Sequence, residues 1–292
     1  MPRRLSLIVN PSAGNGRAAR LLPRAEAALR RLEVDFHVET TTDLDHAREL
    51  ARAAVAADEP AVALSGDGLI GAIAGELQDG PGVLGVLPGG RGNDFARVLG
   101  IPHDVEAACA VVAVGAQRSV DVGDVDGRPF IGVASVGCDS EANRIANQTR
   151  LVRGNVVYAY GALRALATWT PAHFTLDLDG GRRITFSGYS VAAANSRAYG
   201  GGMFIAPEAE LDDGMLDVVC SGQATKRRAL LNLTRVFQGR HVEAPWVHVL
   251  RSREVTVSCD RPFTMYADGD PIGELPLTVR ARHRALQVIV PE

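Results

Sequence analysis

The sequence predicts an α/β protein with an N-terminal doubly wound α/β domain and a second, β-rich domain whose sheet is antiparallel and sandwich-like. Three observations support this fold class. Apolar runs alternate with amphipathic helical stretches up to about residue 115. After about residue 120 the chain changes to short β-rich segments joined by Asp-Gly turns. The length of 292 residues is typical of two domains rather than one.

The first half contains a regular series of strands and helices. Four apolar runs predict buried parallel strands, at 5–9, 34–38, 61–64 and 83–87. Four helical stretches separate or follow them, at 17–31, 43–57, 70–78 and 94–113. In a sheet of this kind, ligands bind beyond the carboxyl ends of the strands.

The second half is rich in Val, Thr, Phe and Tyr and is punctuated by turns at 126–127, 179–180, 213–214 and 268–270. Helices are predicted near 140–168 and 225–238. We therefore expect one domain over 1–120 and another over 121–283. The last strand, 284–292, can complete either sheet, and the pattern does not decide between them.

Composition limits the class of function. The 31 basic and 34 acidic residues give a net charge of −3, which provides no global attraction to nucleic acid. Because the first residues lead directly into a predicted strand at 5–9, we expect no signal peptide, and we expect no apolar stretch long enough to span a membrane. The four cysteines are widely spaced and form no CxxC pair, which favours reduced thiols in a cytoplasmic protein over a disulfide framework or a zinc site: Cys109, Cys138, Cys220 and Cys259.

Three glycine-rich turns carry most of the functional information. Each follows a predicted strand and precedes a helix, so its backbone N–H groups can bind a phosphate. Their candidate binding residues are Asn10, Pro11, Gly14 and Gly16, then Ser65, Gly66, Asp67 and Gly68, and finally Gly90, Arg91, Gly92, Asn93 and Asp94. Arg91 and Asn93 are candidate donors, Asp67 can reach a metal or a hydroxyl, and Asp94 can cap the following helix. The Walker pattern GxxxxGK[ST] is absent.

A pair of carboxylates lies near the end of the chain, in Tyr266-Ala267-Asp268-Gly269-Asp270. One of them could accept a proton from an attacking hydroxyl. The alternative is a charged hairpin turn, since Asp-Gly is common in hairpins. Together with the glycine-rich turns, the pair indicates a phosphotransferase.

These segments resemble the catalytic domain of the diacylglycerol kinase family, which also includes sphingosine and ceramide kinases. The family's NPxxGxG, GGDGTxNE and PxGTxNDFAR turns resemble residues 10–16, 65–72 and 88–97. Its downstream xPxAxxxDGxLD and xxDGE segments resemble residues 206–217 and 266–270. The resemblance covers essentially the whole chain.

The resemblance implies a nucleotide-binding domain, a lipid-substrate domain and an active site between them. ATP would be held by the three turns and by Thr41. A catalytic Mg²⁺ would bridge Asp67 and the phosphates, and a structural Mg²⁺ would bind Asp213 with backbone carbonyls near Glu210 and Met215. The general base would be Asp270, with Asp268 as its partner.

The sequence departs from the family pattern at several positions. Ser65, Leu69, Gly71 and Ala72 replace Gly, Thr, Asn and Glu; Arg91 replaces Thr, and Asp270 replaces Glu. We expect an ATP-dependent lipid kinase that phosphorylates a primary hydroxyl, with diacylglycerol as the default acceptor. An NAD kinase-like enzyme and a catalytically weak lipid-binding or regulatory homologue are the alternatives.

The expected partner is a lipid at a membrane surface, contacted peripherally; homodimerisation stays open. Five arginines could touch such a surface or simply form a solvated helix face: Arg150, Arg153, Arg227, Arg228 and Arg240.

Overall fold

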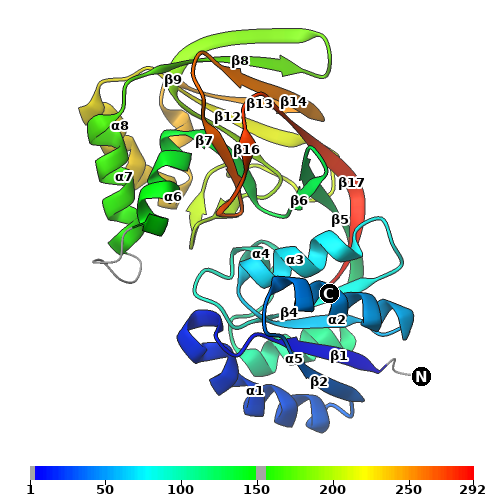
Figure 1. Ribbon diagram of the computed structural model, residues 1–292. Helices are drawn as coiled ribbons and strands as arrows, with labels where there is room; N and C mark the ends of the chain where they lie inside the picture. The colour runs from blue at the N-terminus through cyan, green and yellow to red at the C-terminus, as the bar shows by residue number, and fades with distance from the viewer. Residues whose placement is uncertain (1–3, 149–155) are drawn as a thin grey trace.

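The computed structural model describes residues 4–148 and 156–292. It contains an N-terminal Rossmann-like α/β domain and a C-terminal β-sandwich-like domain, which confirms the predicted fold class (Figure 1). Within the described residues, no helix is long and apolar enough to cross a membrane.

The first domain is built on four parallel strands in the order β4-β3-β1-β2. They are β1 (Leu5–Val9), β2 (Phe36–Thr40), β3 (Ala61–Ser65) and β4 (Val83–Pro88). Helices α1 (Ala13–Arg31) and α5 (Val105–Val114) pack together, as do α2 (Leu44–Ala56) and α3 (Asp67–Leu77). Strands β1, β3 and β4 are buried along their whole length, as their apolar sequences predict.

Three predicted elements differ from the structure. The helix expected over 94–113 is two helices, α4 (Asp94–Val98) and α5, because Gly100 adopts a left-handed φ of 73° and Pro102 cannot continue a helix. Strand β2 begins two residues later than expected. The helix expected over 140–168 is α6 (Cys138–Gln148) and α7 (Val156–Thr168), while Arg150 and Arg153 lie outside the described residues.

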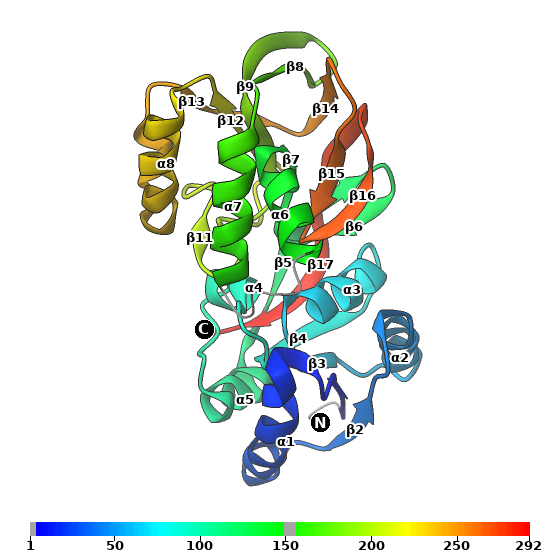
Figure 2. The same cartoon turned by 60° about the vertical axis from the view of Figure 1, so that its left-hand side comes forward.

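The second domain is an assembly of antiparallel strands. Its strands are β5 (Ala116–Val125), β6 (Arg128–Phe130), β7 (Val133–Gly137), β8 (Ala172–Leu178), β9 (Arg182–Ala194), β12 (Leu216–Gly222), β13 (Val247–Ser252), β14 (Glu254–Cys259), β15 (Thr264–Ala267) and β16 (Asp270–Glu274). A separate hairpin joins β10 (Ala198–Tyr199) and β11 (Met203–Phe204). Helices α6, α7 and α8 (Lys226–Arg235) lie beside one another on one side of this domain (Figure 2).

The last strand, β17 (Leu277–Val290), belongs to both sheets. Its first residues pair antiparallel with β14, and Gln287 and Val288 pair parallel with Val83 and Leu84 of β4. It also pairs antiparallel with β5 over most of its length. The described strands of the two domains therefore form one continuous sheet, apart from the β10–β11 hairpin.

Candidate active site

The three glycine-rich turns meet at the carboxyl ends of β1, β3 and β4. A methyl group at Gly90 would lie 2.3 Å from Gly66 Cα, and one at Gly14 would lie 2.7 Å from the Gly89 carbonyl oxygen. Contacts this close leave no room for a side chain, so glycine is required where the turns pack backbone against backbone. The packing brings N–H groups from three separate turns to one edge of the sheet.

The first turn has an unusual backbone. Gly14, Asn15 and Gly16 are all left-handed, with φ of 59°, 58° and 77°, so the regular part of α1 begins at about Arg17, the predicted start. The side chain of Asn10 accepts a hydrogen bond from Ser12 N at 3.0 Å. Pro11, the residue between Asn10 and Ser12, is partly buried. The left-handed turn holds the first helix end against the Gly89-Gly90 backbone.

The third turn is closed by Asn93. Its side-chain oxygen accepts from Gly90 N at 2.8 Å, and its amide donates to the Gly90 carbonyl at 3.1 Å. Asn93 is also 1% exposed, so its polar groups hold the loop together. Arg91, in contrast, is exposed and donates to the Asn15 side chain of the first turn.

Two other residues that were predicted to contact the nucleotide are buried in the fold. The Thr41 hydroxyl donates to the Asp43 carbonyl, and Thr41 is almost fully buried. Ser65 is buried as well, and its carbonyl accepts from Gly89 N at 2.8 Å. Both residues order the turns, and their contact with ATP stays a prediction, as does that of Asn93.

Two carboxylates face one another across the second and third turns. Asp67 is the first residue of α3, with Gly66 at the N-cap, and its Oδ1 accepts from Phe95 N at 3.1 Å. Asp94 does not cap α4 as expected: Asn93 takes the N-cap position, and the Asp94 carboxylate instead pairs with Arg97 and accepts from Gly201 N. Burial, and to a lesser extent the charge of Asp94, raises the pKa of Asp67.

Asp268 is the carboxylate that the second domain brings to these turns. Its oxygens accept from Ile131 N at 2.8 Å, Gly132 N at 2.9 Å and Val133 N at 3.0 Å. A methyl group at Gly132 would lie only 2.4 Å from Asp268 Oδ1. Burial raises the pKa of Asp268 to about 6 although the three N–H donors lower it, and the charge of Asp67 adds to the rise. Such a carboxylate is charged at neutral pH and can accept a proton.

Asp270 has different surroundings from Asp268. It is the first residue of β16, it pairs with Ala267 across the hairpin, and it is exposed. The structure therefore brings Asp67, Asp94 and Asp268 together and leaves Asp270 on the surface of the hairpin.

Sequence reasoning missed a fourth glycine-rich element. Gly200, Gly201 and Gly202 all have positive φ (66°, 86° and 102°) and connect β10 to β11. Gly201 N donates to Asp94 Oδ2 at 2.6 Å, so this hairpin of the second domain contacts the third turn of the first. The run of three glycines was the available signal.

The Asp213 loop lies apart from these turns. Asp213 Oδ1 accepts from Met215 N at 2.9 Å, and its Oδ2 pairs with Arg251. Glu210 is exposed, and the described residues contain no cluster of three or more His, Cys, Asp or Glu side chains able to hold a metal. Because both Asp213 oxygens have partners, a cation there would have to displace Arg251. The structural Mg²⁺ therefore stays a prediction that these contacts do not favour.

Asp67 fits a magnesium ion better. Mg²⁺ in kinases is held by one or two carboxylates together with substrate phosphates, and it does not need an all-protein cage. The raised pKa of Asp67 reflects a partly buried negative charge, which a divalent cation would stabilise.

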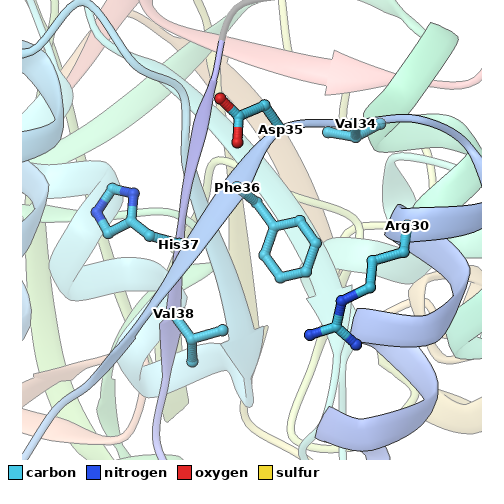
Figure 3. Close-up of a pocket in the computed structure, with 6 residues that line it drawn as sticks. All are labelled: Arg30, Val34, Asp35, Phe36, His37 and Val38. Carbon is cyan, nitrogen blue, oxygen red and sulfur yellow. The ribbon is translucent and has the colours of Figure 1, made fainter.

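A surface hollow of about 420 Å³ lies elsewhere in the first domain (Figure 3). Figure 3 shows it between Arg30 of α1 and the segment from Val34 to Val38. Phe36 pairs with Leu5, the first residue of β1, so the hollow lies toward the amino ends of the strands. The glycine-rich turns follow the carboxyl ends, and we do not assign the hollow to the active site.

Comparison with known proteins identifies the family to which both halves of the chain are similar. Residues 4–125 match the model of the diacylglycerol kinase catalytic domain, and residues 132–290 match that of the YegS C-terminal NAD kinase beta sandwich-like domain. A diacylglycerol kinase from Mycobacterium tuberculosis is 34% identical, with 99% of this chain and 95% of the relative covered. One from Bacillus subtilis is 28% identical over 99% and 97%.

Solved structures share the fold across both domains. A diacylglycerol kinase structure from Bacillus anthracis superimposes with a TM-score of 0.76 at 18% identity, covering 99% of this chain and 97% of that one. An NAD kinase from Archaeoglobus fulgidus in complex with ATP gives 0.52 at 14% identity, covering 99% and 94%. The match at 34% identity over 99% of the chain, together with the two family models, shows that the chain belongs to the diacylglycerol kinase family.

Proposed function

We propose that this lipid kinase transfers the γ-phosphate of ATP to a primary hydroxyl of a lipid, with diacylglycerol as the acceptor and phosphatidic acid as the product. The observation that carries the proposal is the meeting of three glycine-rich turns with Asp67 and Asp268. Backbone N–H groups at helix starts suit a polyphosphate, and a carboxylate with a pKa near neutrality suits a base.

Phosphoryl transfer asks the protein mainly for positioning and charge neutralisation. In the proposed mechanism the turns around Gly14, Gly66 and Gly90 bind the nucleotide phosphates, and Arg91 supplies a positive charge from the exposed side of the loop. Asp67 would hold Mg²⁺, which when bound neutralises charge on the phosphates.

We assign the general base to Asp268 in preference to Asp270. Asp268 is held by three N–H donors beside the turns, whereas Asp270 is exposed on the hairpin. The charge of Asp67 acts on Asp268, which supports a position within the same site. In this role Asp268 takes the proton of the acceptor hydroxyl as the oxygen attacks the γ-phosphorus and the bond to the ADP oxygen breaks.

The test is transfer of radiolabel from γ-labelled ATP to a panel containing diacylglycerol, sphingosine, ceramide and NAD, with Asp67→Ala as the inactive control. We expect labelled phosphatidic acid from the wild type and none from the variant. Label on NAD alone would favour the second candidate, which the NAD kinase-like fold of the second domain supports. Absence of label from every acceptor would favour a binding protein that has lost turnover.

A further inference from the structure

Helix α8 is unusual because none of its ten residues is buried, although it contains three leucines. Leu231 is 70% exposed and Leu230 is 42% exposed. Phe237, in the short 3₁₀ turn Val236–Gln238 that follows, is 56% exposed. Arg227, Leu230, Leu231 and Thr234 are three or four residues apart, so they share one exposed face of the helix.

All charged side chains of helix α8 are basic. Residues 226–235 read KRRALLNLTR, with four basic side chains and no aspartate or glutamate. Some of this charge is engaged locally: Lys226 donates to the Ala167 carbonyl at the end of α7, and Arg235 pairs with Glu243. Arg228 lies over the Trp246 ring at 6.0 Å. Arg227 is exposed on the same face as the leucines.

The neighbouring helix α7 carries a similar set of exposed side chains. Tyr160, Leu163 and Arg164 of α7 are exposed and again lie three or four residues apart, with Leu163 at 50%. Arg164 donates to the Tyr160 hydroxyl at 2.9 Å. Helix α7 contains no acidic residue either. The two helices lie side by side in Figures 1 and 2, and the Lys226 contact joins them.

We propose that this α7–α8 face, defined by Tyr160, Leu163, Arg227, Leu230, Leu231 and Phe237, docks the enzyme on an anionic lipid bilayer. The inference rests on the proposed function, because a long-chain diacylglycerol acceptor resides in a membrane. Exposed leucine and aromatic side chains beside basic ones, on two helices that contain no acidic residue, match the interface of a bilayer carrying negative headgroups. The charge complementarity selects anionic lipid over a neutral surface.

The position of the face in the chain is consistent with delivery of a membrane-borne acceptor. Ile131 to Val133 donate to Asp268, β7 continues from Val133, and α6 follows at Cys138. Helix α7 contacts α6 and α8. The proposed docking helices are thus attached to the segment that holds the proposed base.

The experiment is co-sedimentation of the full chain with vesicles, without nucleotide. Vesicles of phosphatidylcholine containing phosphatidylglycerol are compared with phosphatidylcholine alone. We expect binding to the anionic vesicles, weakened by salt, and weakened about tenfold or more by Leu231→Glu and by Arg227→Glu. The matched control is Val114→Glu in the first domain, because Val114 is 71% exposed, nearly the same as Leu231; it should bind like the wild type.

Three results would overturn the proposal: no binding by the wild type, unchanged binding by Leu231→Glu and Arg227→Glu, or an equal loss in Val114→Glu. Melting temperatures establish that each variant is folded, and Leu231→Ser provides a milder change at the same position. Phosphorylation of a short-chain diacylglycerol in detergent should stay within about twofold of wild type in all variants. That assay tests the proposed function separately, since vesicle binding needs no turnover.

Discussion

At the scale of single residues, Asp268 and Asp270 can be separated by experiment. If Asp268 is the base, Asp268→Asn should lower kcat by about 10²–10⁴-fold with little change in the Michaelis constant for ATP, the range for loss of general base catalysis. Asp270 is exposed, so Asp270→Asn should retain activity within about threefold. Steady-state kinetics on a lipid that the wild type phosphorylates provide the measurement.

Asp270→Glu, which restores the residue of the family pattern, is the matched control for the hairpin. It should behave like Asp270→Asn if position 270 has no catalytic role. A large loss in Asp270→Asn with recovery in Asp270→Glu would return the base to Asp270, the residue that the sequence favoured.

The pH dependence follows from the surroundings of Asp268. Its pKa is raised to about 6, mainly by burial, so the carboxylate is protonated below that pH and cannot accept a proton. We expect kcat/KM, which reports the free enzyme, to be level at neutral pH and to fall about tenfold per pH unit below about pH 6. A profile that stays flat down to pH 4.5 would contradict the assignment.

Magnesium at Asp213 can be tested by melting. With Arg251 and Met215 N on its carboxylate, we expect Asp213→Ala to lower the melting temperature by the same amount with and without Mg²⁺. A magnesium-dependent rise in the wild type that disappears in Asp213→Ala, and persists in Asp67→Ala, would instead establish the structural ion that the family resemblance implied.

At the scale of elements, the glycine-rich turns depend on backbone contact. Gly90→Ala places a methyl group 2.3 Å from Gly66 Cα, so the second and third turns must separate, at a cost of about 1–3 kcal/mol in the free energy of unfolding. Gly68→Ala is the control: no atom lies within 4 Å of the added methyl, and the position is helical. Alanine there should stabilise by about 0.5–1 kcal/mol. Equal denaturation midpoints for the two variants would contradict this packing argument.

The elements that the sequence predicted well are those set by local chemistry. Strands β1, β3 and β4 follow from continuous apolar runs, and the start of regular α1 follows from Gly14 and Gly16. The prediction of one helix over 94–113 was wrong, although the sequence contains Gly100 and Pro102 in this segment. The apolar spacing continues through both residues, and this favoured a single helix. Local breakers outweighed periodicity in that segment.

At the scale of the whole molecule, the site depends on pairings distant in sequence, which periodicity cannot give. Asp268 meets Ile131 through contacts 137 residues apart, and Asp94 meets Gly201 across 107 residues. The motif resemblance brought Asp67 and Asp268 into one hypothesis. It could not show which member of the Asp268–Asp270 pair is held by backbone N–H groups, because that depends on the hairpin and on the backbone of Ile131 to Val133.

The shared strand β17 has a consequence for unfolding. Leu286 is buried in the core of the first domain and Val279 in that of the second, and both lie on this strand. Because one strand pairs with both sheets, neither domain can lose it without disrupting the other, so we expect a single cooperative thermal transition. Leu286→Ala should lower the free energy of unfolding by about 2–5 kcal/mol, and Val279→Ala should lower it as well. Both should shift the same transition in calorimetry and circular dichroism; two transitions, each moved by only one substitution, would show that the domains unfold independently.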